Sequence, residues 1–457
     1  MVITIKEILE ATGGKLLFGN LNGEISAICT DSRKIEKGMF FVPLCGVRFD
    51  GHDYITQCFE QGAVGCVTDR EIPAYANGVA ILVRDTTKAL GDIARSYHAK
   101  LATPIVAITG SVGKTTTKEM IAAVLAEKFN TLKTQGNFNN EIGMPLTLLK
   151  LEPTHEMAVV EMGMSGMGEI ERMAKIAQPS IGVITNIGMS HIEKLGSQQN
   201  ILKAKLELFT DFQADNIAIL NADDLMLYGQ RGRLPCKTVY YGIYNHVADI
   251  RAENIRYEGE NGTTFEVTWQ GKAYLVKIGQ PGEHNVYNAL AAIAVGVCVN
   301  IEMTKIIEGL TQYIPEKMRM QIYEVNGIKF IDDCYNASIA SMRAALGVLG
   351  DMQGVRKVAI LGDMLEMGGF SQKAHQEVGE VVARKGVDLL IATGWDAQFM
   401  TQSAIKNGLK PEQAHYFSDK AQAIAFAKSV VITGDAVLVK ASRSMQMEAF
   451  IKAFETN

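Results

Sequence analysis

A glycine-containing loop between a buried strand and a helix is the feature that most constrains the fold of this chain. Residues 105–109 form a near-continuous apolar run, which is typical of a buried strand, and residues 115–128 repeat apolar side chains at helical spacing. Between them stands Gly110-Ser111-Val112-Gly113-Lys114-Thr115. Glycines in such a loop let backbone N–H groups turn toward phosphate oxygens, and the helix N-terminus adds partial positive charge. The pattern therefore predicts a phosphate-binding loop at the carboxyl end of a strand in an α/β fold.

The side chains of this loop predict binding of a nucleoside triphosphate, ATP, with magnesium. Lys114 is placed to reach the β and γ phosphates, and the Thr115 hydroxyl is placed to ligate magnesium. The full consensus has a further glycine where this chain has Ile108, so the loop is a shortened variant. The alternative is a glycine turn with an incidental lysine, which the agreement of strand, helix and threonine run disfavours. The residues expected around the phosphates are Gly110, Ser111, Val112, Gly113, Lys114, Thr115 and Thr116.

Further apolar runs predict a doubly wound, mostly parallel sheet around this loop. Parallel strands are covered on both faces, so they appear as near-continuous apolar segments, and such segments stand at 158–161, 181–185 and 217–220. Residues 239–278 contain alternating apolar and polar positions and a turn at Gln270-Gly271, which predicts inserted antiparallel hairpins. The pattern of parallel strands and helices resumes later, with strands expected at 357–361, 389–393 and 436–440.

The chain length and two proline-containing breaks in the pattern of strands and helices predict three domains. At 457 residues the chain is too long for one ordinary core. Ala102-Thr103-Pro104 and Ile314-Pro315 interrupt the pattern, which places the boundaries near residues 100 and 315. We therefore expect a small mixed α/β domain over 1–100, a central nucleotide-binding domain over 101–314 with the hairpin insertion, and a Rossmann-like α/β domain over 315–457.

Charge and composition narrow the partners and the compartment. Lys plus Arg total 45 against 50 for Asp plus Glu, so the net charge of −5 gives no general attraction to nucleic acid or anionic membranes. The longest apolar run, 289–299, is far short of the ~20 residues that span a bilayer. The N-terminal residues lack the basic start and apolar core of a signal peptide, and the seven cysteines form no Cys-x-x-Cys pair. We expect a cytoplasmic protein whose cysteines are small buried residues.

Three side chains outside the loop are candidates for the same site. Glu161 ends a predicted strand, at the edge where doubly wound folds bind ligands, and it would be a second magnesium ligand or an ordinary solvated acid. His191 follows another strand end and would be a ligand or a structural histidine. Lys205 lies on a predicted helix that could return toward the site, although a solvated lysine is the commoner case.

With these residues in place, the chain resembles the Mur ligases of peptidoglycan synthesis over essentially its whole length. The resemblance extends well beyond the phosphate loop, which continues as Thr116-Thr117-Lys118-Glu119. The other matching segments are 136–143 (Gly-Asn-Phe-Asn-Asn-Glu-Ile-Gly), 282–290 (Gly-Glu-His-Asn-Val-Tyr-Asn-Ala-Leu), 332–337 (Asp-Asp-Cys-Tyr-Asn-Ala), 361–368 (Leu-Gly-Asp-Met-Leu-Glu-Met-Gly) and 439–443 (Val-Lys-Ala-Ser-Arg).

The resemblance implies roles for the candidate residues. It makes Glu161 and His191 ligands of two magnesium ions, together with Thr115, and it matches Lys205 to a carbamylated lysine of the family. Carbamylation is chemically reasonable, because an uncharged lysine in a dry, cation-rich pocket can capture carbon dioxide and become an anion. The resemblance also implies adenine contacts from Asn288 and Arg319, ribose contacts from Asp333, and substrate contacts from Ser32, Arg48, Asn139 and Asn140.

The segments around Ser32 and Arg48 are similar to the UDP-sugar binding segments of the family. Hydroxyl, backbone and arginine donors suit a diphosphate. Without the rest of the chain, a pair of polar turns with a local salt bridge would be the simpler interpretation. The implied substrates are UDP-N-acetylmuramoyl-tripeptide, bound by the domain over 1–100, and D-alanyl-D-alanine, bound by the domain over 315–457. They are joined by a monomeric enzyme that does not insert into membranes.

Two other functions are kept open by the sequence. Within the same class, the chain could be another Mur ligase or a folylpolyglutamate synthetase, although the UDP-type first domain argues against the folate enzyme. From a different class, the phosphate loop could belong to a nucleotide-gated switch that hydrolyses ATP slowly. Phosphate release that depends on both carboxylate and amine substrates would distinguish the ligase from the switch.

Three segments depart from the family pattern. Ser338-Ile339 stands where the family usually has Asn-Pro, and Ala441 stands where it has glycine. The segment before Arg319, Glu316-Lys317-Met318, also lacks the usual glycine. We expect these changes to alter the fine geometry of the last domain and of the adenine contacts, and to leave the phosphate loop and the metal positions untouched.

Overall fold

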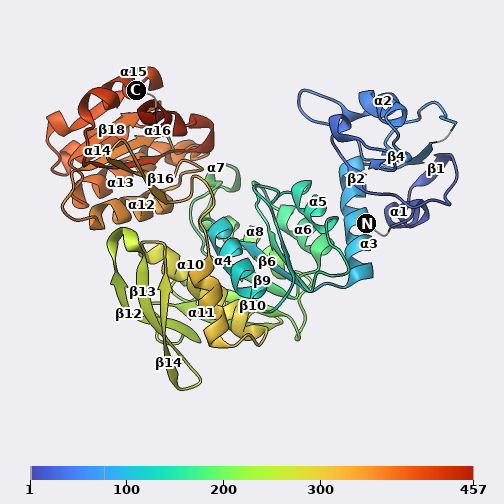
Figure 1. The fold of residues 1–457 in the computed structure, drawn as a ribbon, viewed down its shortest axis with the longest axis horizontal. Coiled ribbons are helices and arrows are strands. Elements are labelled where there is room, and N and C mark those ends of the chain that lie inside the picture. The colour runs from blue at the N-terminus through green and yellow to red at the C-terminus, as the bar shows by residue number, and fades with distance from the viewer. Residues whose placement is uncertain (1–2, 77, 456–457) are drawn as a thin grey trace. The chain divides into compact units, whose positions relative to one another are not determined.

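The computed structural model describes residues 3–76 and 78–455 and contains three β-sheets (Figure 1). Met1 and Val2 belong to the N-terminal segment that was compared with a signal peptide, and they lie outside the described residues. The chain packs as two compact units: one comprises Met1–Ile108, Phe129–Gly182 and Glu207–Asn216, and the other comprises Thr109–Lys128, Val183–Leu206 and Ile217–Asn457. No described helix combines the length and apolar character that crossing a membrane requires.

The first sheet confirms the small mixed α/β fold expected near the N-terminus. Its strand order is β1-β5-β4-β3-β2, and only β1 runs antiparallel to its neighbour. Phe41, Cys66 and Ala80 from these strands share a buried cluster with Ile55 and Cys58 of α2. The bounds are β1 (Lys15–Phe18), β2 (Ile28–Cys29), β3 (Phe40–Phe41), β4 (Gly65–Thr68), β5 (Val79–Leu82), α1 (Ile5–Thr12), α2 (Ile55–Glu60) and α3 (Thr86–Leu101).

The central sheet has nine strands in the order β14-β13-β12-β11-β10-β9-β6-β8-β7. The pairs β6–β8, β7–β8, β10–β11 and β11–β12 are parallel, as predicted for a doubly wound sheet. The strands are β6 (Ile105–Thr109), β7 (Thr131–Lys133), β8 (Met157–Glu161), β9 (Ile181–Ile184), β10 (Ile217–Asn221), β11 (Lys237–Gly242), β12 (Ile250–Tyr257), β13 (Thr263–Trp269) and β14 (Lys272–Ile278).

The helices that accompany the central strands include α4, which directly follows the phosphate loop. Their bounds are α4 (Lys114–Ala126), α5 (Gly143–Leu148), α6 (Glu169–Ala177), α7 (Ile192–Leu195), α8 (Gln198–Leu206), α9 (Leu225–Tyr228), α10 (Glu283–Cys298) and α11 (Met303–Gln312).

The predicted hairpin region is correct only in part. Strands β12, β13 and β14 pair antiparallel and form the inserted hairpins. Strand β11, however, pairs parallel with both β10 and β12, so the antiparallel region begins later than residue 239. The reason is that Val239, Tyr240 and Tyr241 are all buried, as in a strand covered on both faces, and do not alternate.

The third sheet confirms the Rossmann-like architecture expected of the last part of the chain. Its order is β15-β16-β20-β17-β18-β19, and all strands are parallel except β15. The bounds are β15 (Gln321–Val325), β16 (Ile328–Asp332), β17 (Lys357–Gly362), β18 (Leu389–Thr393), β19 (Ala414–Phe417), β20 (Ala436–Lys440), α12 (Ile339–Asp351), α13 (Ser371–Arg384), α14 (Gln398–Lys406), α15 (Lys420–Val430) and α16 (Glu448–Glu455).

The departures from the family pattern have local structural accounts. Ser338 is the N-cap of α12 and forms a reciprocal capping box with Ser341, which replaces the start that Asn-Pro would provide. Met318 adopts a left-handed backbone with φ of 60°, the conformation that glycine favours, and its side chain packs against the core of the third sheet. Ala441 is fully buried, and a Cβ added at Gly362 would lie 2.8 Å from the Ala441 Cβ.

The predicted domain boundaries fall at the ends of helices. Helix α3 ends at Leu101 and is followed by Ala102 in a left-handed conformation. Helix α11 ends at Gln312 and precedes Ile314, whose side chain is exposed. The two compact units do not follow these boundaries, because residues 109–128 and 183–206 of the central sheet region belong to the same unit as the third sheet. The three-domain division therefore stays a prediction.

Candidate active site

The phosphate loop occupies the turn between β6 and α4 with little free space around its glycines. Lys114 donates its Nζ proton to the Gly110 carbonyl oxygen over 2.8 Å, which bridges the two ends of the loop. A Cβ added at Gly110 would lie 1.8 Å from Thr185 Oγ1, and one added at Gly113 would lie 2.7 Å from Asn288 Oδ1. Both glycines have positive φ, so a side chain would meet both backbone strain and a clash. The loop backbone is therefore closely enclosed by its neighbours.

A segment that the sequence analysis did not single out shapes this loop. Asn186 follows β9 and clamps Val112: its Oδ1 accepts the Val112 N–H over 3.0 Å, and its Nδ2 donates to the Val112 carbonyl over 2.9 Å. Ser111 Oγ accepts the Gly188 N–H over 2.8 Å. Thr185 Oγ1 donates to the same Val112 carbonyl over 2.6 Å. The residues after β9 thus fix the path of the loop.

Arg319 lies against the residue predicted to ligate magnesium. Its Nη2 donates to Thr115 Oγ1 over 3.1 Å, and its guanidinium carbon lies 3.7 Å from the centroid of the Tyr335 ring. The Thr115 hydroxyl oxygen keeps a second lone pair, which is the donor that a hard cation requires. The structure thus connects Arg319 with the phosphate end of the site.

The other two residues expected at the nucleoside are held by neighbours. Asn288 lies in α10, where its Oδ1 accepts a hydrogen bond of 3.0 Å from Thr117 Oγ1 and its Nδ2 donates to Asn285 Oδ1. Asp333 follows β16 and forms a buried ion pair with Lys440, which also donates to the Asn336 carbonyl. Any contact of either residue with a nucleoside stays a prediction.

His191 and Lys205 carry unusual electrostatic environments. His191 has a left-handed backbone with φ of 63°, and its Nδ1 lies 2.6 Å from Glu366 Oε2. Burial lowers the pKa of His191. Lys205 lies inside α8 with its side chain fully buried, and burial holds the pKa of this lysine well below its usual range, with a further lowering from the Lys114 cation. Both causes favour the uncharged amine form of Lys205 over its ammonium form.

Glu161 is the last residue of β8 and belongs to the compact unit that contains residues 129–182. One of its carboxylate oxygens accepts a hydrogen bond and the other does not. Asn139 Nδ2 donates to Glu161 Oε1 over 2.8 Å, and the Glu161 N–H donates to Thr134 Oγ1 over 3.1 Å. Glu161 Oε2 is buried and has no hydrogen-bond partner among residues 3–76 and 78–455. Such an oxygen is costly to leave unpaired, and its acceptor-only chemistry fits a magnesium ion. Glu161 pairs in register with Ile108 of β6, close in sequence to the loop.

The predicted substrate residues have structural partners of their own or are exposed. Asp31 and Arg33 form a two-pronged ion pair, with both contacts at 2.8 Å, which is the local salt bridge that the simpler interpretation expects. Ser32 begins a short 3-10 helix beside this pair, and Arg48 is exposed. Asn140 Oδ1 accepts the N–H groups of Ile142 and Gly143 before α5. Substrate contacts of these residues stay predictions.

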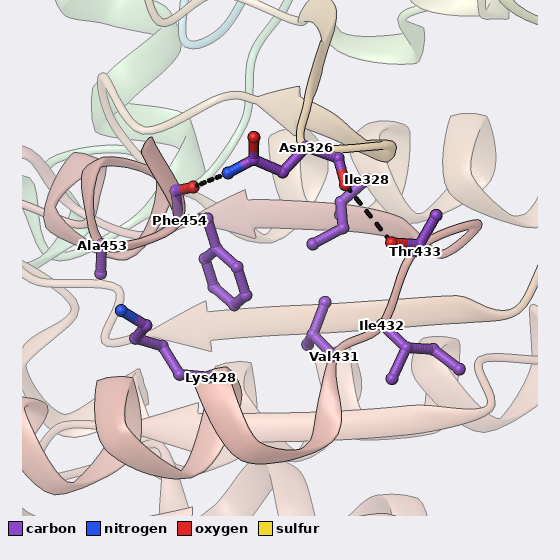
Figure 2. Close-up of a pocket in the computed structure, with 8 residues that line it drawn as sticks. All are labelled: Asn326, Ile328, Lys428, Val431, Ile432, Thr433, Ala453 and Phe454. Atoms are coloured by element: carbon purple, nitrogen blue, oxygen red, sulfur yellow. Dashed lines mark hydrogen bonds between the residues drawn. The ribbon is translucent and has the colours of Figure 1, made fainter. Parts of the chain in front are cut away.

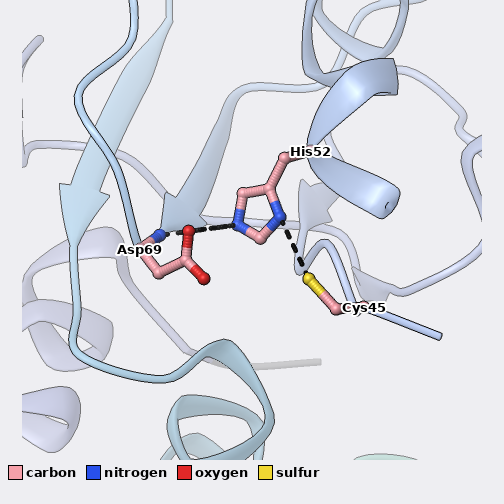
Figure 3. Close-up of side chains that lie close together, drawn as sticks. All are labelled: Cys45, His52 and Asp69. Carbon is pink, nitrogen blue, oxygen red and sulfur yellow. Dashed lines mark hydrogen bonds and ion pairs between the residues drawn. The ribbon is translucent and has the colours of Figure 1, made fainter. Parts of the chain in front are cut away.

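A polar cluster beside the exposed Arg48 segment contains Cys45, His52 and Asp69 (Figure 3). Their potential ligand atoms lie within 4.8 Å of one another. The sulfur of Cys45 lies 3.7 Å from His52 Nδ1, whereas Asp69 Oδ1 lies 3.3 Å from Nε2, on the other side of the ring. Cys45 and Asp69 lie against different ring nitrogens of His52, so a single nitrogen lone pair cannot point at an ion that both of them also bind. The cluster therefore fits hydrogen bonding better than metal binding. Cys45 is exposed, contrary to the burial expected of all the cysteines.

A pocket of about 560 Å³ in the third sheet contains none of the predicted site residues (Figure 2). Ile328, the first residue of β16, contributes to its lining, as do the ends of α15 and α16. Asn326 Nδ2 donates to the Phe454 carbonyl across one side of it. The pocket therefore lies at the amino end of β16, whereas Asp333 follows the carboxyl end of the same strand. The lining residues are Asn326, Ile328, Lys428, Val431, Ile432, Thr433, Ala453 and Phe454.

Three family models match most of the chain. The model described as Mur ligase middle domain matches residues 108–296, and the one described as Mur ligase, glutamate ligase domain matches residues 318–443. The model described as Mur ligase family, catalytic domain matches residues 24–98. These matches include the phosphate loop, the Glu161 and His191 segments, and the Asp333 and Glu366 segments.

Curated relatives and solved structures agree with these models over the full length. The chain is 38% identical over 453 residues to the UDP-N-acetylmuramoyl-tripeptide–D-alanyl-D-alanine ligase of Bacillus subtilis (strain 168), with 98% of this chain and 97% of the relative covered. A crystal structure of MurF from Acinetobacter baumannii matches with a TM-score of 0.92 and 31% identity over 100% of this chain and 99% of that one. The MurF ligase of Thermotoga maritima in complex with ADP matches with a TM-score of 0.83 and 28% identity over 94% and 97% of the two chains.

Proposed function

The chain belongs to the Mur ligase family, and on that premise we propose that it joins D-alanyl-D-alanine to UDP-N-acetylmuramoyl-tripeptide. The reaction is driven by ATP and releases ADP and phosphate. Its product is the pentapeptide precursor of peptidoglycan. The observation that carries this proposal is the enclosed phosphate loop with Lys114, in a chain similar over its full length to ligases of that name.

In the proposed mechanism, the terminal carboxylate of the tripeptide attacks the γ-phosphorus of ATP. A bond forms between the carboxylate oxygen and phosphorus as the bond to the ADP oxygen breaks, which gives an acyl phosphate. The amine of D-alanyl-D-alanine then attacks the acyl carbon, loses a proton and expels phosphate. Lys114 and the backbone N–H groups of the loop hold the triphosphate and offset the charge on the transferred group. The protein thus acts by positioning and electrostatics.

Thr115, Glu161, His191 and carbamylated Lys205 would hold two magnesium ions in this proposal. Bound magnesium supplies neutralisation of phosphoryl charge. The unpaired Glu161 Oε2 supports the assignment, since a buried carboxylate oxygen needs a cation or a donor. The low pKa of buried Lys205 supports carbamylation, because only the uncharged amine attacks carbon dioxide. The nitrogen–carbon bond forms with loss of a proton, and the product is an anion.

The remaining assignments complete the proposal. Asn288, Arg319 and Asp333 contact the nucleoside, while Ser32, Arg48, Asn139 and Asn140 contact the UDP-linked substrate. The stacking of Arg319 on Tyr335 supports a planar ligand nearby, and the exposure of Arg48 leaves its guanidinium available for a diphosphate. We propose a cytoplasmic, monomeric enzyme that binds neither nucleic acid nor membranes.

The decisive experiment measures ADP release by the purified full-length protein with each substrate omitted in turn. The ligase predicts release only with ATP, UDP-tripeptide and dipeptide together, whereas a slow nucleotide switch predicts release from ATP alone. Folylpolyglutamate synthesis would require a folate and glutamate instead. Using UDP-tripeptides that end in lysine or in diaminopimelate would identify the third residue.

Lys114→Ala is expected to lower kcat by at least about 100-fold, the usual loss when one charge-stabilising group is removed from such a site. Lys194→Ala, at an exposed lysine on α7, is the matched control and should retain the wild-type rate. Ligation by Lys114→Ala at an unchanged rate would contradict the proposed function.

A further inference from the structure

The loop that follows β17 is fixed at three successive residues before it reaches the catalytic region. The Asp363 carboxylate accepts the N–H groups of Trp395, Asp396 and Ala397 over 2.7, 3.1 and 2.8 Å. Asp363 is itself only 5% exposed. Three charge-assisted hydrogen bonds to consecutive backbone donors hold a carboxylate in one orientation. The first residue of the loop is thus tied to the segment after β18.

The next two residues are held by side chains from other parts of the third sheet. His375 Nε2 accepts the Met364 N–H over 3.0 Å, and His375 is fully buried in α13. Ser442 Oγ, just after β20, accepts the Leu365 N–H over 2.9 Å. Three separate segments therefore determine the path of the loop up to residue 365. The position of the next side chain is a property of the third sheet.

That side chain is Glu366, and it meets His191. Glu366 Oε2 lies 2.6 Å from His191 Nδ1 within the same compact unit, an ion-pair contact in which Nδ1 has no hydrogen bond of normal geometry to the described residues. Glu366 has φ of 61° and His191 has φ of 63°, a conformation that side-chain-bearing residues rarely adopt. A Cβ added at Gly368 would lie 3.0 Å from Glu193 Cγ, so the two segments pack closely beside the contact. Strained backbone on both sides of one ion pair indicates that the pair is specified by its surroundings.

We propose that Glu366 is a positioning residue for the metal site, whose carboxylate accepts the Nδ1–H of His191 when Nε2 faces the cation. The inference rests on the proposed function, in which His191 is a metal ligand. Metal-binding histidines usually donate their second ring N–H to a carboxylate or carbonyl, which fixes the tautomer and the direction of the ring. Here the orienting carboxylate comes from the third sheet, whereas the ligand follows β9 of the central sheet. The position of the 363–368 loop therefore affects how tightly His191 binds the metal.

The exposure of Glu366 makes this role testable without unfolding the protein. The side chain of Glu366 is 59% exposed, so its replacement leaves the hydrophobic core intact. Glu366→Gln keeps an oxygen that accepts the Nδ1–H, whereas Glu366→Ala removes it. Glu380→Ala, at an exposed glutamate on α13, removes the same charge away from His191. These variants separate orientation from a general loss of negative charge.

The test is a Mn²⁺ titration of the full-length protein, followed by electron paramagnetic resonance, with β,γ-methylene ATP present. Glu366→Ala is expected to weaken Mn²⁺ binding about 10-fold or more, as removal of such a partner usually does. Glu366→Gln should retain most of the wild-type affinity, and Glu380→Ala all of it. In the ligase assay, Glu366→Ala should need more Mg²⁺ for half-maximal rate and recover kcat at saturating Mg²⁺.

Two results would overturn the inference: unchanged Mn²⁺ affinity in Glu366→Ala, or an equal loss in Glu366→Gln and Glu366→Ala. His191→Ala distinguishes this from a failure of the proposed function. If His191→Ala weakens Mn²⁺ binding and Glu366→Ala does not, Glu366 alone is misassigned. If His191→Ala binds Mn²⁺ as the wild type does, the metal role of His191 fails and the inference fails with it.

Discussion

Lys205 differs from an ordinary surface lysine in its burial and in its pKa. Its side chain is 2% exposed, and burial together with Lys114 keeps its pKa well below the usual range. An uncharged amine can form a carbamate, whereas an ammonium cannot. The same burial excludes the solvated-lysine interpretation of the sequence.

We therefore predict that Lys205 is carbamylated. After equilibration with [13C]bicarbonate, the wild-type protein should give a carbamate carbon signal by nuclear magnetic resonance. Lys205→Ala should lose that signal and most ligase activity, because the anion proposed to face magnesium is gone. Lys203→Ala removes an exposed lysine two positions away on α8 and should keep both. A carbamate signal that survives in Lys205→Ala would assign the modification elsewhere.

Sequence patterns predicted some site residues and could not predict others. Lys114 and Thr115 could be proposed as site residues because the spacing within one short loop predicts their roles. Asn186 and Glu366 were not, since each acts on a residue far away in the chain, Val112 and His191 respectively. A single sequence carries no signal for such pairs. The segments that contain them were visible only as strand ends or as part of the family resemblance.

At the scale of elements, the phosphate loop depends on the absence of a side chain at Gly110. Gly110→Ala would place a Cβ 1.8 Å from Thr185 Oγ1, so the loop or the β9 end must move. We expect a loss of stability of about 1–3 kcal/mol, typical of overpacking, and weaker binding of an ATP analogue. Thermal denaturation and calorimetric titration measure the two effects.

The matched control for this loop variant is Gly232→Ala. Gly232 has φ of 71°, but an added Cβ would meet nothing within 4 Å. This variant carries backbone strain without a clash, so it should cost about 1 kcal/mol and leave nucleotide affinity unchanged. Equal nucleotide affinity in Gly110→Ala and wild type would contradict the enclosure of the loop described above.

The start of α12 gives a second prediction for an element. Ser338 caps this helix, and Ser338→Ala should cost about 1 kcal/mol of local stability. Ser338→Asn should be nearly neutral, because asparagine is an equally good cap. Hydrogen–deuterium exchange of residues 339–342 reports this local change directly. Ser429→Ala, at an exposed serine of α15, should leave that exchange unchanged. Faster exchange in Ser338→Asn than in Ser338→Ala would contradict the prediction.

Most strands were predictable because burial on both faces produces near-continuous apolar runs. The strands at 105–109, 389–393 and 436–440 have the predicted bounds. The start of helix α10 at Glu283, in contrast, is hard to predict, since its first turn contains polar residues that interrupt the apolar pattern. Strand β19 was not predicted, because its four residues are only half-buried and the apolar signal is weak. Tertiary packing decides such cases.

For the whole molecule, the proposed reaction requires three ligands to meet. UDP-tripeptide, ATP and dipeptide are assigned to the three successive parts of the chain, and reacting atoms must approach to about 3–3.5 Å. The ends of α3 and α11 lie near residues 100 and 315, where left-handed Ala102 and exposed Ile314 mark breaks in regular structure. Such element ends are where hinge motions are absorbed. We therefore predict that substrate binding closes the protein about these two positions.

Small-angle X-ray scattering tests this closure in solution. The radius of gyration should fall when β,γ-methylene ATP and UDP-tripeptide are both present, because the two ligands contact different parts of the chain and stabilise the conformation in which both contacts form. Either ligand alone makes only part of those contacts and should produce less compaction. Lys114→Ala, which binds the triphosphate poorly, should show little change under the same conditions. A wild-type radius of gyration that is unaffected at saturating concentrations of both ligands would mean that the reacting groups already meet in the free enzyme, and that neither hinge is needed for catalysis.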